Sequence, residues 1–268
     1  MGIINATPDS FSDGAELQRS GAASFQLDID KALFRAETMV AEGAIFIDVG
    51  GESTRPGAAT VSEQEELDRV IPLIAAISAS LDVCVSVDTS SPVVMKEALG
   101  SGAQLINDIR ALAIPGAAEL LGSTKAAVCL MHMQGAPSTM QKTPSYDSVV
   151  LEVFDFLKSR VAYSLECGIE RDRLLIDPGF GFGKTVQHNY QLLKNLGYFS
   201  QLEIPLLVGL SRKSMIGEVV ARPVDQRLAG SIAATTLALA SGARIIRTHD
   251  VAATMDAIRV NLAYSSAE

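Results

Sequence analysis

Carboxylate and amide side chains end several of the short apolar runs in this 268-residue sequence. Asp88, Asn107 and Asp177 each come directly after such a run. Their oxygens accept hydrogen bonds, and one carboxylate can accept two parallel N–H bonds. Acceptors set among apolar residues suit a flat heterocycle that presents adjacent N–H donors. The pattern therefore predicts a pocket for a ring of that kind.

Cationic side chains near other run ends offer the opposite chemistry. Arg55, Lys213, Arg247 and His249 form a group that would attract an oxyanion. Lys213 and Ser214 also precede a predicted helix, whose free N–H groups would strengthen anion binding. The sequence thus predicts a site with one half for a ring and one half for an anion.

Three further features allow more than one interpretation. The Gly-Lys-Thr sequence at 183–185 looks like the end of a phosphate-binding loop, which needs a glycine five positions earlier. Pro178 stands there and has no N–H to donate, so we do not predict such a loop. His132 is interpreted as a structural or pocket-wall group rather than a base. For Asp108 and Asp250, helix capping and a functional role both stay open.

The elements that must position these groups follow from the apolar pattern. Strands are predicted at 2–5, 45–49, 83–88, 104–108, 126–132, 174–177, 205–211 and 243–247. Helices are predicted at 30–42, 91–99, 147–166 and 226–240. One more helix is predicted to follow the Ser62–Glu65 capping box and another to follow a cap at 248–250. The segment 115–122 is predicted to be a short connection.

Short strands that alternate with helices favour a (β/α)8 TIM barrel over a doubly wound open sheet. All strand C-termini of such a barrel open on one face. That face would gather Asn5, Asp48, Asp88, Asn107, His132, Asp177, Ser211, Lys213, Arg247 and His249. We expect one domain over residues 1–268, because no linker or low-complexity segment interrupts the pattern.

Composition limits the partners and the compartment. A net charge of -9 argues against a general nucleic-acid or membrane-surface binder. Cys84, Cys129 and Cys167 form no CxxC pair, and the N-terminus shows no signal peptide, so we expect reduced thiols and a cytoplasmic protein. The apolar helix at 226–240 is expected to serve either a dimer or the barrel wall.

Several motifs stand in one order along the chain, at 5–14, 50–57, 86–89, 106–108, 177–183, 211–214 and 247–249. With them, the sequence closely resembles the bacterial dihydropteroate synthases, the sulfonamide targets of folate biosynthesis, nearly end to end. The resemblance implies a transferase that condenses 6-hydroxymethyl-7,8-dihydropterin diphosphate with 4-aminobenzoate. The products would be 7,8-dihydropteroate and pyrophosphate, and Mg²⁺ would assist the reaction. Because members of the family are often homodimers, the resemblance also implies a homodimer.

The resemblance also implies a role for individual residues. The pterin would be held by Asp88, Asn107, Asp177 and Lys213, with Met131 and Phe182 packing beside it. Asn5 would contact Mg²⁺, and the diphosphate would bind Thr54, Arg55, Arg247 and His249. In a dissociative path, Asp13 would stabilise the cationic pterin methylene. The aminobenzoate site would be framed by Phe11, Pro56, Lys213 and Ser214.

Two departures from the family pattern shape these expectations. Family members usually carry a segment before the first strand, and here that strand begins almost at Met1, so we expect a less covered barrel floor. The usual Asp-Gly-Gly of the first loop reads Asp13-Gly14-Ala15, which bears on loop closure. The rival functions are a pterin-binding methyltransferase domain and a non-catalytic pterin-binding module. The motifs at 53–57 and 211–214 favour the synthase.

Overall fold

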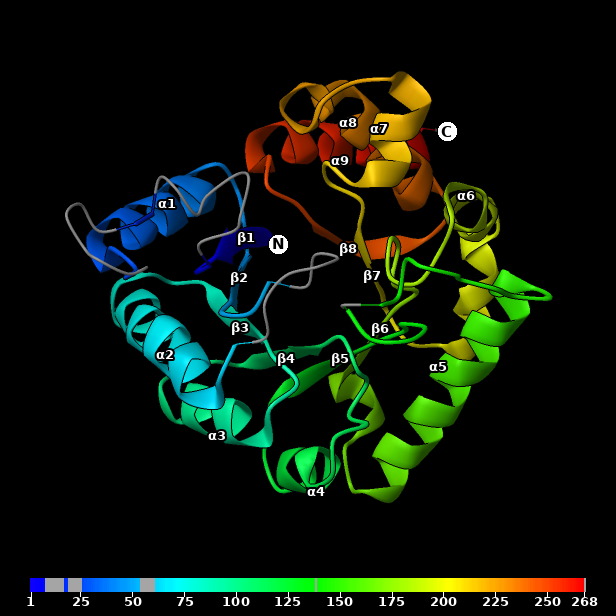
Figure 1. Cartoon of the computed structure of the whole chain (residues 1–268). Coiled ribbons are helices and arrows are strands. Elements are labelled where there is room, and N and C mark those ends of the chain that lie inside the picture. Colours follow the sequence, from blue (N-terminus) through cyan, green and yellow to red (C-terminus); the bar gives the residue numbers. More distant parts are fainter. Residues whose placement is uncertain (8–16, 19–25, 54–60, 138, 268) are drawn as a thin grey trace.

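Eight parallel strands of this protein form one sheet in sequence order (Figure 1). The computed structural model describes residues 1–7, 17–18, 26–53, 61–137 and 139–267. The strands are β1 (Gly2–Asn5), β2 (Phe46–Gly50), β3 (Cys84–Asp88), β4 (Leu105–Asp108), β5 (Ala127–Met131), β6 (Leu174–Asp177), β7 (Leu206–Gly209) and β8 (Ala243–Arg247). A parallel bridge between Gly2 and Thr248 brings the end of β8 back to β1 and closes the barrel.

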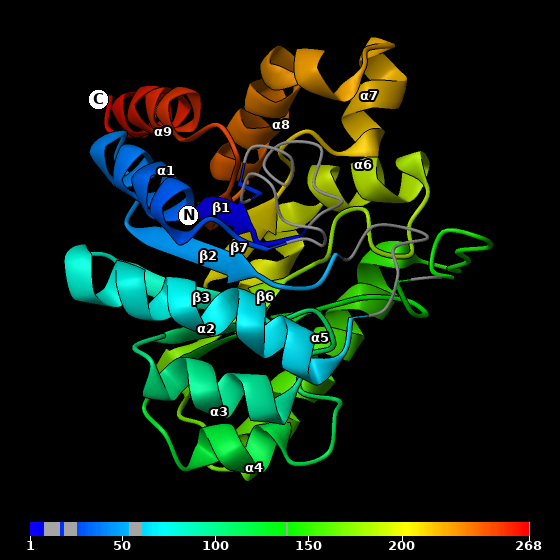
Figure 2. The ribbon, with the colours of Figure 1, turned by 60° about the vertical axis from the view of Figure 1, so that its left-hand side comes forward.

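Helices follow the strands and surround the sheet (Figures 1 and 2). They are α1 (Ile29–Ala41), α2 (Glu63–Ser80), α3 (Pro92–Gly100), α4 (Ala117–Gly122), α5 (Val149–Glu166), α6 (Val186–Lys194), α7 (Ser214–Val220), α8 (Leu228–Ala240) and α9 (Val251–Ser265). The predicted (β/α)8 barrel is therefore confirmed. Among the residues that the structure describes, no helix has both the length and the apolar composition that membrane crossing requires.

The capping predictions explain where two helices begin. The Ser62 hydroxyl accepts from the Glu65 N–H at 3.3 Å, and the Glu65 carboxylate accepts from the Ser62 N–H at 3.0 Å. Ser91 caps α3 in the same way, with Pro92 at its first position. Asp250 is the N-cap residue of α9, but its side chain makes no cap bond and pairs with Arg212 at 2.5 Å, so capping by this side chain, one of the two roles left open, is not observed.

The segment 115–122 also differs from its prediction as a short connection. Its last six residues form α4, which begins after Gly116 at a φ of 87°. Ala117, Ala118 and Leu121 are buried in this helix. A helix of six residues spans fewer than two turns, so its apolar spacing is too short to stand out in the sequence.

The barrel interior changes character from one end to the other. At the N-terminal end, Met1, Leu105, Cys129 and Leu207 form a small apolar cluster. Along β4, Asn107 lies on the same face as Leu105, one pleat nearer the C-terminal end, because side chains on a strand alternate between faces. The larger apolar core lies outside the sheet, between strands and helices. The C-terminal rim is thus where polar side chains enter the barrel.

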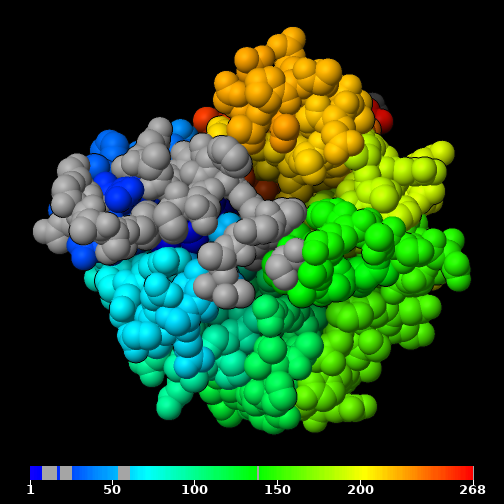
Figure 3. Space-filling model, viewed as in Figure 1, coloured from blue at the N-terminus to red at the C-terminus, as the bar shows by residue number. Residues whose placement is uncertain are grey.

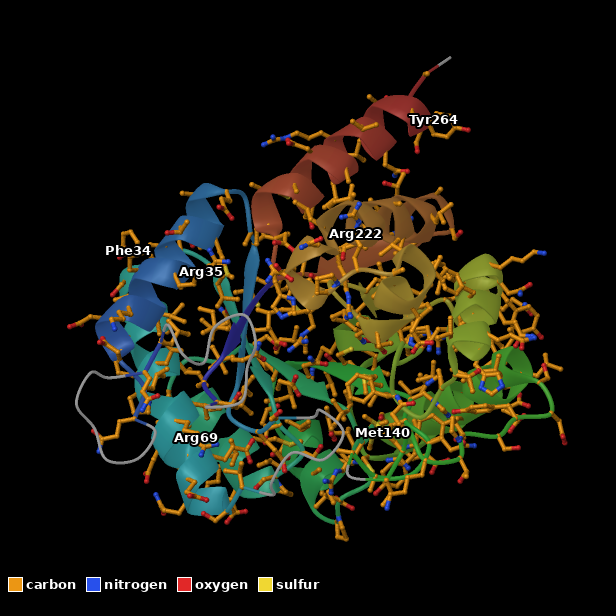
Figure 4. The ribbon with its side chains drawn as sticks, turned by 45° about the horizontal axis from the view of Figure 1, so that its top comes forward. Phe34, Arg35, Arg69, Met140, Arg222 and Tyr264 are labelled. Carbon is orange, nitrogen blue, oxygen red and sulfur yellow. The ribbon has the colours of Figure 1, made fainter. Side chains whose placement is uncertain are left out.

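Arginines on two helices fix the loops of this rim. Arg35 on α1, labelled in Figure 4, donates to the carbonyl of His249 at 3.1 Å and so ties the first helix to the start of α9. Arg69 on α2, labelled in the same view, donates to the carbonyl of Gly51 at 2.9 Å. The chain therefore leaves β2 and β8 along paths that these side chains determine.

Candidate active site

An ion network crosses the rim between β2, β3 and β8. Arg247 Nε lies 2.6 Å from Asp48 Oδ2, and its Nη2 lies 2.9 Å from Asp88 Oδ2. Ser86 donates its hydroxyl to the other Asp48 oxygen at 2.5 Å. Asp48 is fully buried, so its charge depends on these partners. The prediction that Asp48, Asp88 and Arg247 come together at one face of the barrel is confirmed.

Asn107 completes this half of the rim. Its Nδ2 donates to Asp48 Oδ2 at 3.2 Å. Within the described ranges, Asn107 Oδ1 is the one buried side-chain oxygen or nitrogen that has no hydrogen-bond partner. Leaving such an acceptor unsatisfied costs about 1–3 kcal/mol, so a donor from a ligand would stabilise it. The amide acceptor that the sequence predicted is therefore present and lacks a donor.

The network raises the pKa of both Asp88 and Arg247, for different reasons. Burial raises the pKa of Asp88 to about 7, the negative charge of Asp48 adds to this, and Arg247 opposes it. For Arg247, burial acts to lower the pKa, but Asp48 and Asp88 together outweigh it and raise the pKa above its ordinary value. The cation stays charged, while Asp88 can exchange a proton near neutral pH.

The other half of the rim carries Asp177 and Lys213. Asp177 ends β6 and accepts from the Gly179 N–H at 2.7 Å. Lys213, between β7 and α7, donates to the Phe180 carbonyl and lies 4.9 Å from the centre of the Phe182 ring. Burial lowers the pKa of Lys213 to about 8, and the charge of Asp177 opposes this. Both side chains therefore contact the loop 178–185.

A lysine inside that loop holds it in place. Lys184 is 3 % exposed, and its Nζ lies 2.8 Å from the Gly179 carbonyl, 3.0 Å from the Phe182 carbonyl and 2.9 Å from His132 Nδ1. Burial lowers the pKa of Lys184 well below its ordinary value. The lysine of the Gly-Lys-Thr sequence is thus engaged by carbonyls of its own loop and by the His132 ring.

His132 has the structural role that we expected. Its ring is buried against Phe156, edge to face at 4.9 Å between centroids. Burial, and then the charge of Lys184, lower its pKa to about 3. The imidazole is therefore neutral and serves as a partner of Lys184.

The carbonyls of Gly181 and Gly183 in the loop are also occupied. Gln141 donates to Gly181, and the Tyr146 hydroxyl donates to Gly183 at 2.8 Å. Gly179 has a φ of 70°, and a Cβ there would lie 1.8 Å from the His132 carbonyl oxygen. The loop is therefore pressed against the end of β5, which explains why it needs glycine at that place.

Other predicted site residues lie at strand ends, with contacts of their own. Met131 is buried at the end of β5, paired in register with Asp177. His249 Nδ1 lies 3.0 Å from the Ser211 hydroxyl, and Ser214 is exposed at the start of α7. Asn5 ends β1 beside Gly50. The predicted residues Phe11, Asp13, Thr54, Arg55 and Pro56 lie outside the described residues.

The open question about Asp108 is answered by its contacts. It accepts from the Ser90 hydroxyl at 2.5 Å and from the N–H groups of Arg110 and Leu112 at 2.8 and 2.7 Å. It is fully buried and adjacent to Asn107, so it points to the opposite face of β4. Asp108 therefore caps a turn outside the barrel, while Asn107 faces the interior.

Comparisons with known proteins place this site in a family. Residues 1–249 match the family described as pterin binding enzyme. The chain belongs to the pterin-binding enzyme family. Dihydropteroate synthase of Haemophilus influenzae is 54% identical over 260 residues, which cover 97% of this chain and 91% of the relative. The Escherichia coli enzyme of the same name is 51% identical over 268 residues, covering 100% and 92%.

Solved structures agree with the sequence relatives of this pterin-binding enzyme. A Yersinia pestis dihydropteroate synthase in a sulfonamide complex has a TM-score of 0.94 at 49% identity, covering 99% of this chain and 94% of that one. A Xanthomonas albilineans dihydropteroate synthase with 4-aminobenzoic acid has a TM-score of 0.90 at 46% identity, covering 100% and 93%. The barrel and its strand order are therefore those of dihydropteroate synthases.

Proposed function

We propose that this chain is a dihydropteroate synthase that condenses 6-hydroxymethyl-7,8-dihydropterin diphosphate with 4-aminobenzoate. The products are 7,8-dihydropteroate and pyrophosphate. The Asn107 Oδ1 atom carries the proposal, because it is a buried acceptor that lacks a donor and it forms an acceptor edge with the neighbouring Asp88. A pterin presents N–H donors along one side of its rings and matches that edge. A Xanthomonas albilineans relative is known in complex with 7,8-dihydropteroate.

The charges of the rim suit a reaction in which a diphosphate leaves. Asp88, Asn107 and Asp177 accept the N–H groups of the pterin, and Met131 and Phe182 pack beside it. Arg247, His249 and Lys213 stabilise the negative charge that develops on the leaving pyrophosphate. Arg247 remains charged throughout, because Asp48 and Asp88 hold its proton. The arylamine then attacks the methylene carbon of the pterin and loses a proton.

We propose Mg²⁺ as the metal of the reaction, with Asn5 as its ligand from the protein. The amide of Asn5 offers a hard oxygen, and its Oδ1 lies near Gly50 and Asp88. In the described part of the chain, no three His, Cys, Asp or Glu side chains cluster to hold a metal alone. This fits Mg²⁺, which commonly takes few protein ligands and binds substrate phosphates. When bound, it would neutralise charge on the diphosphate.

Release of pyrophosphate tests the proposed function. The reaction should require pterin diphosphate, 4-aminobenzoate and Mg²⁺ together, and omission of any one should abolish release. A methyltransferase domain, the rival among enzymes, would transfer a methyl group and release no pyrophosphate. A binding module would bind the pterin without turnover. Absence of pyrophosphate with all three components present would refute the proposal.

We also propose a homodimer formed through α7 and α8. The α8 helix buries Ala234 and Ala238, whereas Leu237 is 57% exposed and Leu228 is 43% exposed. On α7, Val219 is 62% exposed. In Figure 3, α7 and α8 form a prominent part of the surface at the top of the view. Apolar side chains exposed on neighbouring helices mark interaction surfaces.

Sedimentation velocity tests the dimer at micromolar concentration. The wild-type chain should sediment as a dimer, and Leu237→Glu should shift it to a monomer, because a buried charge destabilises the interface. A monomeric wild type would contradict the proposal. For location, we propose the cytoplasm, which the three free thiols of Cys84, Cys129 and Cys167 support.

A further inference from the structure

Asp48 lies beneath the acceptor edge, where it contacts Asn107 directly and is linked to Asp88 through Arg247. It is 0% exposed and accepts hydrogen bonds from Arg247, Ser86 and Asn107. The partners come from three other strands, β8, β3 and β4. Asp48 itself is covered by them, so it acts on a ligand only through its neighbours.

The chemistry of Asp48 determines how the Asn107 amide is turned. An ionised carboxylate is acceptor-only, whereas an amide has a donor end and an acceptor end of nearly the same shape. Asp48 pairs with the Arg247 guanidinium at 2.6 Å, and its two oxygens accept from Arg247, Ser86 and Asn107. Asn107 must therefore present its NH₂ group to Asp48, which is the orientation observed, with Nδ2 at 3.2 Å. The carbonyl end is then left as the unpartnered buried oxygen.

We propose that Asp48 is a positioning residue that sets the hydrogen-bond polarity of the ring site. It makes Asn107 an acceptor toward the ligand and anchors Arg247 on the same carboxylate. The inference rests on the proposed function, because the ring is taken to be a pterin. A ring with an amino donor at this edge binds well. A ring with a carbonyl there places two acceptors together and is rejected.

A purely structural role for Asp48 predicts a different outcome. Loss of a buried carboxylate that only supports the fold would lower the affinity for every ligand by a similar factor. Loss of the polarity control would instead change the choice between two ligands. If Asp48 becomes an amide, it can donate as well as accept, and Asn107 is free to turn its own NH₂ toward the ligand. Discrimination is therefore the decisive measurement.

The test compares two rings by isothermal titration calorimetry. The probes are 6-hydroxymethylpterin and 6-hydroxymethyllumazine, in which a carbonyl acceptor replaces the 2-amino donor and N1 gains a proton. We expect the wild type to prefer the pterin strongly, since sites built to pair a polar group reject analogues that lack it. Asp48→Asn should reduce this preference at least about tenfold, because it weakens the binding of the pterin and strengthens the binding of the lumazine.

Asp108→Asn is the matched control. Asp108 is also 0% exposed and also accepts three hydrogen bonds, yet it lies on the outer face of β4 next to Asn107. The substitution should lower the melting temperature and leave the preference for pterin unchanged. An equal loss of preference in both variants would mean that general loosening of β4 is responsible, and would overturn the proposal.

A milder variant tests Asp48 if Asp48→Asn does not fold. Ser86→Ala removes the hydroxyl that holds the second Asp48 oxygen at 2.5 Å, so the carboxylate can turn away from Asn107 and no longer fixes the orientation of its amide. We expect the preference for pterin to fall severalfold. Full wild-type preference in folded Asp48→Asn, or in Ser86→Ala when that is the variant available, would overturn the polarity role.

Failure of the proposed function has a separate signature. If the chain is not a synthase, pyrophosphate release fails while the pterin preference and its dependence on Asp48 can still be measured. If the polarity role alone is wrong, the wild type releases pyrophosphate and Asp48→Asn keeps its preference. A wild type without any preference for pterin would refute the inference directly.

Discussion

The two halves of the rim are held together by different kinds of contact. Between β2, β3 and β8, side chains hold one another by charge, through Asp48, Arg247 and Asp88. Between β5, β6 and β7, lysines hold main-chain carbonyls, with Lys184 on Gly179 and Phe182. The first half is a network of side chains, and the second is a loop fixed along its backbone.

This difference determines what each half can do for a ligand. In the charged half, Asp88 titrates near neutral pH and Asn107 keeps one acceptor unpartnered, so both can change partners when a ring binds. In the other half, the carbonyls from 179 to 183 each accept a bond from a side chain. We infer that the charged half responds to the substrate, whereas the loop half presents a rigid surface to it.

Removal of Lys184 should have the largest effect on the rigid half. Lys184→Met keeps the length of the side chain but leaves the Gly179 and Phe182 carbonyls and His132 Nδ1 without this donor. Buried acceptors that lose their partner cost about 1–3 kcal/mol each, and relief of the buried charge offsets part of this. We expect the free energy of unfolding to fall by about 3 kcal/mol in urea titrations.

Two variants calibrate that measurement. Tyr146→Phe removes only the hydroxyl that donates to Gly183 and should cost about 1 kcal/mol. Lys142→Met removes an exposed lysine nearby and should change stability by less than about 0.5 kcal/mol. If Lys184→Met is no more destabilising than Lys142→Met, the loop does not depend on its lysine and the contrast between the halves fails.

The pH dependence of kcat/KM for the pterin substrate gives a smaller and more specific effect. Asp88 must be ionised to accept a ring N–H, and burial raises its pKa to about 7. Lys213 must be protonated to donate, and burial lowers its pKa to about 8. The rate should rise with pH through about 7 and fall above about 8, about tenfold per unit on either side.

Variants from each half assign the two limbs of that profile. Asp88→Asn should remove the acidic limb and Lys213→Ala the basic limb, and each should weaken pterin binding about tenfold. Calorimetry with a pterin checks the affinity independently of turnover. Wild-type affinity in both variants would overturn the site assignment. A profile that is flat between about pH 6 and about pH 9 would contradict the titration of both groups.

Much of the barrel and part of its site could be predicted from the sequence. The strand ends at Asp88, Asn107 and Asp177 stood out because a polar residue after an apolar run is readable without coordinates. Their convergence followed from the barrel, since all strand C-termini share one face. Arg247 was predicted as an anion ligand, and the structure adds its bonds to two carboxylates.

Asp48 and Lys184 show where sequence reasoning ends. Asp48 follows the same pattern as Asp88, but only the coordinates show that Arg247, Ser86 and Asn107 cover it. Lys184 lies in a Gly-Lys-Thr sequence that resembles the end of a phosphate-binding loop, an interpretation that Pro178 ruled against. Nothing in the local sequence indicates that the amine of Lys184 binds carbonyls of its own loop. Both roles depend on contacts between elements far apart in the chain, which residue spacing does not encode.

The bond between Arg247 and Asp48 joins residues 199 positions apart, and the bond to Asp88 joins residues 159 apart. Two carboxylates supplied early in the chain thus acquire this cation only from its last strand. During synthesis, a chain that has not yet reached β8 has no Arg247 to neutralise them, and buried carboxylates without a cation are strongly unfavourable. The polar rim therefore couples the synthesis of β8 to the assembly of the site, because no fragment that ends before Arg247 can form the network.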